Sequence, residues 1–153
     1  MFSIEWEGFD DVKKALDKWE ADAIAAVARE VLNSGEHLLQ QAQALAPKET
    51  GDLEGSGTLS GGGEASALLN IPAGAAPKID PAAREISVEV SFHKEYAARQ
   101  HEGAHSPGPI TRGKPGTEVG PAGRKYLERP LVYFMPRYLR NIADAIRRTT
   151  EGR

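Results

Sequence analysis

The longest regular pattern in the chain spans residues 20–46 and has the sequence EADAIAAVAREVLNSGEHLLQQAQALA. Alanine, leucine and glutamine dominate this stretch, and all three form helices readily. Apolar side chains recur at every seventh position, at Ile24, Val31, Leu38 and Leu45, with Ala28, Gly35 and Ala42 between them. This spacing places them along one side of a helix. The stretch therefore predicts a long helix with one packing face, which Pro47 ends.

The residues before this helix favour a strand and then a shorter helix. Phe2, Ile4 and Trp6 alternate with polar residues, which is typical of a strand with one buried face. Asp10 is a plausible N-cap for a first helix that carries an apolar stripe. Whether this first helix continues into the long one is left open by the sequence.

The clearest strand follows later, over residues 86–92. Ile86, Val88, Val90 and Phe92 alternate strictly with polar residues, so one face is predicted to be core and the other wet. A second, short strand is expected at residues 67–71 before a proline-bounded loop. Residues 48–63 are rich in glycine, serine and threonine, which predicts a turn and then a flexible segment with little burial.

The C-terminal part predicts an amphipathic, basic helix over about residues 126–150. Its apolar side carries Leu131, Met135, Tyr138, Leu139, Ile142 and Ile146, and its other side carries Arg137, Arg140, Arg147 and Arg148. Pro136 would kink this helix or mark a second start. Tyr133, Phe134 and Tyr138 are interpreted as core residues, so packing with a solvated charged edge is favoured over binding to DNA phosphates.

Length and composition bound the possibilities. A chain of 153 residues is expected to form a single domain, 1–153, with flexible segments at about 54–66 and 103–123. The chain has no cysteine, which excludes disulfides, thiolate zinc sites and cysteine nucleophiles. It has no apolar run long enough to span a membrane, and its acidic start is unlike a secretory signal, so a cytoplasmic location is expected.

The two halves of the chain carry opposite charge. Residues 1–80 have 6 basic and 14 acidic side chains, whereas residues 81–153 have 13 basic and 8 acidic ones. The halves could neutralise each other within one fold. Alternatively, the acidic and basic faces of neighbouring copies could meet in a head-to-tail ring.

One pattern suggests catalysis. His101-Glu102-Gly103-Ala104-His105 matches H-E-x-x-H, in which two histidines one helical turn apart hold zinc and the glutamate activates a water molecule. The chemistry requires a helix through both histidines, but Gly103 and Pro107 disfavour one. The preferred interpretation places His101 and His105 at the surface or at an interface beside a loop, with no catalytic residue, metal or cofactor. A zinc-dependent hydrolase using His101, Glu102 and His105, and a small cytoplasmic binding module, remain the alternatives.

Three stretches, in this order, resemble the tail-completion or head-tail joining family of long-tailed double-stranded DNA bacteriophages. The first runs from Ala42 to Leu53, where a long alanine-rich helix ends in Ala46-Pro47 and Thr50-Gly51-Asp52-Leu53 follows. The second is the strand at residues 86–92 leading into Tyr96-Ala97-Ala98-Arg99-Gln100-His101-Glu102-Gly103. The third is Tyr126-Leu127-Glu128-Arg129-Pro130-Leu131, which is similar to the family's aromatic-leucine-x-x-proline start of the terminal helix. Glu54 departs from the family, where many members carry a basic residue after the turn.

The resemblance implies an α+β subunit with long N-terminal helices and a C-terminal helix packed on a small, mostly antiparallel sheet, with long flexible loops. It also implies a ring, commonly a hexamer, in the neck or tail of the virion, assembled in the host cytoplasm. Its partners would be copies of itself, the head-side connector and the tail-terminator or tail-tube proteins, with DNA passing through without specific binding. The assembly-contact candidates are Thr50, Gly51, Leu53, Glu54, Tyr96, Glu102, Tyr126, Arg137 and Arg140.

Overall fold

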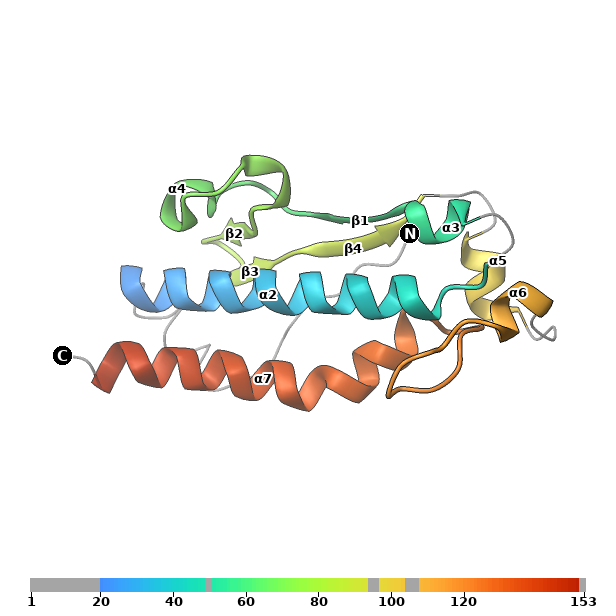
Figure 1. Cartoon of the computed structure of the whole chain (residues 1–153). Helices are drawn as coiled ribbons and strands as arrows, with labels where there is room; N and C mark the ends of the chain where they lie inside the picture. Colours follow the sequence, from blue (N-terminus) through green and yellow to red (C-terminus); the bar gives the residue numbers. More distant parts are fainter. Residues whose placement is uncertain (1–19, 49–50, 94–96, 104–107, 152–153) are drawn as a thin grey trace. The chain divides into compact units, whose positions relative to one another are not determined.

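A computed structural model of the chain describes residues 20–48, 51–93, 97–103 and 108–151. The strand predicted at residues 2–6 and the first helix lie outside these residues. The elements in chain order are α2 (Ala21–Leu45), α3 (Asp52–Gly55), β1 (Gly57–Ser60), α4 (Ser66–Leu69), η1 (Ala73–Ala75), β2 (Lys78–Asp80), β3 (Glu85–Ser87), β4 (Glu89–Phe92), α5 (Ala97–Glu102), α6 (Pro109–Arg112) and α7 (Glu128–Glu151), as Figure 1 shows.

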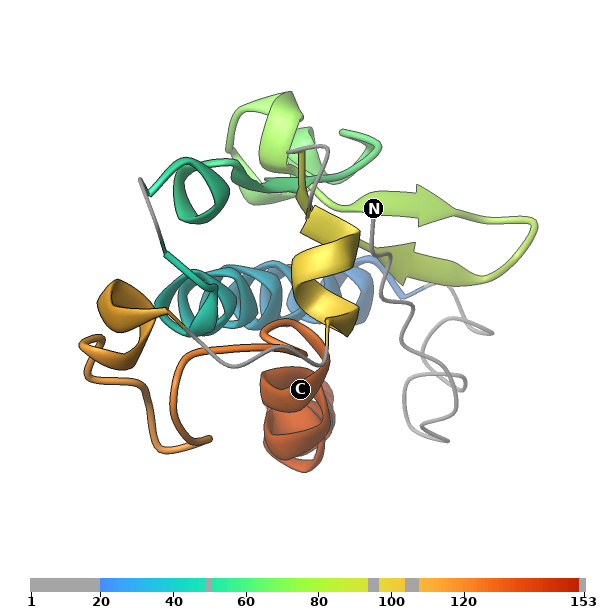
Figure 2. The same cartoon turned by 90° about the vertical axis from the view of Figure 1, so that its right-hand side faces the viewer.

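The predicted α+β class is confirmed. α2 matches the long helix expected at residues 20–46, and α7 matches the expected basic terminal helix. The two long helices lie side by side (Figures 1 and 2). The strands form two small sheets, in which β1 pairs with β4 and β2 pairs with β3. None of the described helices is long and apolar enough to cross a membrane.

The chain forms two compact units, and α2 and α7 contribute residues to both. Within the described residues, the first unit contains 36–48, 51–59, 90–93, 97–103 and 108–134, and the second contains 20–35, 60–89 and 135–151. The expectation that residues 1–153 form one domain stays a prediction.

The first unit is built around the C-terminal half of α2. Leu38 and Leu45 are fully buried on the predicted packing face. His37 of α2 meets Phe134 of α7 edge to face, with ring centroids 4.7 Å apart. Phe92 of β4 packs edge to face on Tyr126, at 5.1 Å. A seven-residue spacing in the sequence thus becomes one apolar face against which a strand and a second helix pack.

Close packing in this unit also explains one glycine. A Cβ atom at Gly57, the first residue of β1, would lie 2.9 Å from the side chains of both Leu39 and Phe92. Real Cβ atoms do not approach so closely, so only glycine lets β1 lie this close to α2.

The second unit combines the N-terminal half of α2, the β2–β3 hairpin and the C-terminal half of α7. In the antiparallel hairpin Ile79 stands opposite Ile86, which is buried. Val27 and Val31 of α2, Ile142 of α7 and Leu69 of α4 are among the other buried apolar residues of this unit. The segment expected to be a strand at residues 67–71 is α4 instead, so that prediction is wrong.

The strand predicted at residues 86–92 is present but divided. Ile86, Val88, Val90 and Phe92 are all buried, as the alternation predicted. The segment forms two elements because β3 pairs with β2 whereas β4 pairs with β1. Ser91 was expected on a wet face but is 1% exposed, because its hydroxyl lies 3.2 Å from that of Thr58 across the sheet.

Two further expectations are corrected. Residues 48–63 were expected to be largely irregular, yet they contain α3 and β1, and Leu53 is buried. The proline-rich segment at residues 103–123 was expected to lack regular structure, yet it contains α6 and a short turn closed by a bridge between Thr117 and Gly120.

Pro136 does not begin a second helix, because α7 continues through it.

Candidate functional site

The H-E-x-x-H pattern does not lie on one helix. α5 ends at Glu102, and Gly103 follows outside it. This confirms that the helix ends within the pattern. His105 lies outside the described residues.

His101 is buried at 2% exposure, so the interpretation that it is a surface residue is wrong. Its Nε2 accepts a hydrogen bond from the backbone N–H of Glu128 at 3.3 Å. Its Nδ1 lies 2.9 Å from a carboxylate oxygen of Glu102. A neutral imidazole with its hydrogen on Nδ1 satisfies both contacts. Both ring nitrogens are therefore engaged, and His101 links α5 to the start of α7.

Glu102, Glu128 and His101 form the one potential metal-binding cluster within the described part of the chain, with ligand atoms within 4.8 Å of one another. An ammonium group already stands between the carboxylates. Lys125 Nζ lies 2.7 Å from Glu102 and 2.9 Å from Glu128. A metal ion would have to displace this lysine from both carboxylates and take one imidazole nitrogen out of its present hydrogen bond. The arrangement fits an ion-pair cluster better than a zinc site.

The ion pairs shift the pKa values of both partners. The hydrogen bond from Lys125, followed by that from His101, lowers the pKa of Glu102. The hydrogen bonds to Glu102 and Glu128 raise the pKa of Lys125. Because the folded pKa of Glu102 is depressed, its contribution to stability is present at neutral pH and is lost as the pH falls through that lowered value.

Replacing Lys125 with methionine should therefore raise the pKa of Glu102 toward its ordinary value, because the largest cause of its depression is removed. The carboxyl carbon of Glu102 can be followed by NMR across an acid titration. Lys48→Met is the matched control, since Lys48 pairs with Glu54 and not with Glu102. An unchanged Glu102 titration in Lys125→Met would show that the pair does not form in solution.

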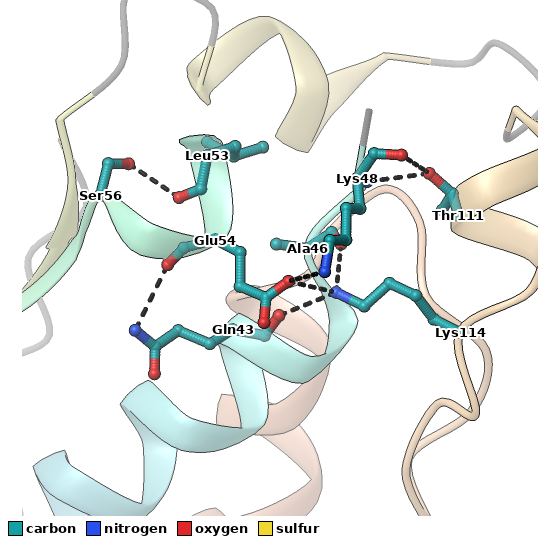
Figure 3. A network of polar contacts seen from close by, with 8 residues as sticks. All are labelled: Gln43, Ala46, Lys48, Leu53, Glu54, Ser56, Thr111 and Lys114. Carbon is teal, nitrogen blue, oxygen red and sulfur yellow. Dashed lines mark hydrogen bonds and ion pairs between the residues drawn. The ribbon is translucent and has the colours of Figure 1, made fainter. Parts of the chain in front are cut away.

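A second polar cluster surrounds Lys114 (Figure 3). Lys114 Nζ donates hydrogen bonds to the carbonyl oxygens of Gln43 at 3.0 Å and Ala46 at 2.8 Å. It also lies 3.3 Å from the carboxylate of Glu54. The lysine thereby satisfies carbonyl groups that the end of α2 leaves without helical partners, where the helix dipole favours a cation.

The same cluster fixes α6 and α3 to the end of α2. The backbone N–H of Lys48 donates to the Thr111 hydroxyl at 2.9 Å, and that hydroxyl donates to the Lys48 carbonyl at 3.2 Å (Figure 3). Glu54 of α3, where many members of the resembled family carry a basic residue, is thus held by Lys114. The part of residues 103–123 that carries α6 is anchored at Thr111 and Lys114.

An open, mostly apolar hollow of about 420 Å³ lies beside the first turns of α7. Val119, Val132 and Tyr133 form its apolar lining, and Lys125, Glu128 and Arg129 complete it. Val132 is 67% exposed and Tyr133 is 52% exposed. Tyr133 was assigned to the core together with Phe134 and Tyr138, and for Tyr133 that assignment is wrong. We call this feature the α7 hollow.

The structure separates the assembly-contact candidates into groups. Leu53 and Tyr126 are buried, so their side chains serve the core of the first unit and not an exposed contact surface. Gly51 has a φ of 90° and forms the N-cap of α3, a backbone conformation that favours glycine. Glu54 is held by Lys114. The exposed candidates are Glu102, Arg137 and Arg140, whereas Thr50 and Tyr96 lie outside the described residues.

Sequence reasoning missed Lys114, Lys125 and the α7 hollow. Lys114 bonds residues of α2 and α3, and Lys125 bonds Glu102, all far away in the chain, so no local pattern marks these contacts. The pair of Lys125 with Glu128 is local, at a spacing of three residues. The exposure of Tyr133, in contrast, could have been predicted from the sequence. Tyr133 precedes Arg137 by four residues and Arg140 by seven, and this helical spacing places it on the charged face.

Comparisons of the chain with protein-family models, with curated proteins and with solved structures found no match.

Proposed function

We propose that the chain is a structural subunit of a tailed bacteriophage particle, part of a ring at the head-tail interface that joins the tail to the head. Its partners are copies of itself, commonly six in the resembled family, the head-side connector, and the tail-terminator or tail-tube proteins. DNA passes through the ring without specific binding. The subunit is not an enzyme and needs no cofactor.

The observation that carries this proposal is that parts of the three resembling stretches, or residues close to them in the chain, bond to one another within the first unit. The Gly123 N–H, just before the third stretch, donates to the Leu45 carbonyl in the first at 2.8 Å. The Tyr126 hydroxyl donates to the Ala97 carbonyl in the second at 2.9 Å. Three short motifs, separated along the chain, therefore build one framework. This contact between the motifs is what a common family architecture would require.

The surface chemistry supports an assembly role over the hydrolase alternative. His101 uses both ring nitrogens in contacts within the chain, and Glu102 and Glu128 hold Lys125. An exposed apolar hollow next to charged residues is instead typical of a protein contact surface.

Deleting the coding sequence from the phage that carries it should yield filled heads and separate tails, because no subunit would join them. Electron microscopy of the lysate provides the measurement, and supplying the chain from a plasmid should restore joined particles. Mass spectrometry of purified virions should detect the chain. Normal virions after deletion would overturn the proposal.

Native mass spectrometry of the purified chain with added zinc separates the proposal from the hydrolase alternative. We expect metal-free chains, because zinc must compete with Lys125 for both carboxylates. One tightly held zinc ion per chain, lost on replacing His101 with alanine, would favour the hydrolase instead.

A further inference from the structure

The α7 hollow exposes apolar surface that the described part of the chain leaves uncovered. Val132 and Tyr133 lie next to each other on α7, and both are more than half exposed. Covering apolar surface is worth roughly 25 cal/mol per Å². A hollow of this kind therefore favours a partner that inserts an apolar side chain.

The same unit presents such a side chain elsewhere on its surface. Ile110 on α6 is 55% exposed. The following residue, Thr111, is buried and bonded to both backbone groups of Lys48, and Lys114 is bonded to the end of α2. Ile110 thus projects from an anchored turn, which lowers the conformational entropy lost on binding. α6 and the first turns of α7 stand apart in both views (Figures 1 and 2).

Charges next to these two surfaces are complementary. Arg112, on the same short helix as Ile110, is exposed and has no ionic partner within the described residues. Glu118, one residue before Val119 of the hollow, is also exposed. Its contact in the described part of the chain is the Tyr133 hydroxyl, at 3.4 Å. A basic group therefore accompanies the projecting side chain. At the hollow, Lys125 is already paired with Glu102 and Glu128, and Arg129 already donates to backbone carbonyl groups, so Glu118 is the acidic group placed to meet Arg112.

We propose that the α7 hollow of one copy receives Ile110 of a second copy, with Arg112 of the second copy placed against Glu118 of the first. The two surfaces differ, so the contact is head-to-tail, and its repetition closes into a ring or continues as a filament. The inference rests on the proposed function, because a ring in the neck requires a head-to-tail contact between neighbouring copies.

The absence of cysteine from the chain allows a direct test. Copies carrying Ile110→Cys are mixed with copies carrying Val132→Cys and treated with a short bis-maleimide reagent at high protein concentration. The mixture should give cross-linked dimers, whereas each variant alone should stay largely monomeric on a denaturing gel. Copies with Leu68→Cys, which replaces another exposed apolar residue, serve as the control partner for Ile110→Cys.

A mixture that cross-links no more than this control would overturn the contact. Equal cross-linking of either variant alone would also overturn it, because a head-to-tail contact does not bring two copies of the same position together. All three positions are exposed, so the variants should fold, which circular dichroism checks.

A charge exchange tests the orientation independently. Arg112→Glu should weaken self-association, measured by sedimentation, by about tenfold. Adding Glu118→Arg to the same chain should restore most of the loss. A double variant as weak as the single one would contradict the pairing.

The tests distinguish failure of the contact from failure of the proposed function. If the copies cross-link but the chain is absent from virions, the proposed function alone is overturned. If the chain is a virion protein but its copies do not cross-link, this contact alone is overturned.

Discussion

Replacing Tyr126 with alanine should lower the free energy of unfolding by about 4 kcal/mol, within the range for truncating a large buried aromatic side chain. Tyr126 is fully buried in the first unit. Its ring packs edge to face on Phe92 and on His101, each at 5.1 Å. Removing it would leave a cavity between β4, α5 and the start of α7. Urea unfolding followed by circular dichroism measures the loss.

Tyr126→Phe separates packing from hydrogen bonding. It keeps the ring but removes the hydroxyl that donates to the Ala97 carbonyl at 2.9 Å. The expected loss is about 1 kcal/mol, as is usual for one hydrogen bond. Burial raises the pKa of Tyr126 to about 12, so its absorbance should not change in mild alkali while the chain is folded. Equal losses in Tyr126→Ala and Tyr126→Phe would show that packing of the ring does not contribute to the free energy of unfolding.

Replacing Lys114 with methionine should lower the free energy of unfolding by about 2–3 kcal/mol. The Lys114 side chain is 11% exposed, and it bonds two carbonyl groups at the end of α2 and the Glu54 carboxylate. Methionine fills similar space but donates no hydrogen bond, so the two carbonyl oxygen atoms lose this donor and Glu54 keeps only the longer contact with Lys48. The loss should be seen in thermal and urea unfolding of the whole chain.

Lys48→Met is the matched control for Lys114→Met. Lys48 is 42% exposed, and its Nζ lies 3.8 Å from the same Glu54 carboxylate. An exposed pair of this kind contributes little, so we expect a loss of less than about 0.5 kcal/mol. Should Lys48→Met prove as damaging as Lys114→Met, the charge of Glu54, and not the capping of α2, would carry the stability.

Local patterns in the sequence were sufficient for the two long helices and for the alternation of the main strand. In α2 the apolar seam at Leu38 and Leu45 is buried as its spacing predicts. In the strand, Val90 and Phe92 are buried as the alternation predicts. These features depend on helix propensity and on side-chain periodicity, which are properties of neighbouring residues.

Local patterns failed where the outcome depended on a distant partner. Ser91 is buried because Thr58 lies opposite it, and the strand divides because each half pairs with a different segment. His101 is buried because the Glu128 backbone and the Glu102 side chain satisfy its ring nitrogens. In the isolated sequence, a polar residue is expected at the surface unless its partner is known.

By itself, therefore, the sequence determined that the chain forms two long amphipathic helices around a small amount of strand, without cysteine chemistry. It also supplied the family resemblance on which the proposed function depends. Only the tertiary structure decided how the H-E-x-x-H residues are used and where apolar surface remains exposed. It decided these points because Lys125 bonds Glu102 and Lys114 bonds the end of α2, which are residues far apart in the chain, and such contacts exist only after folding.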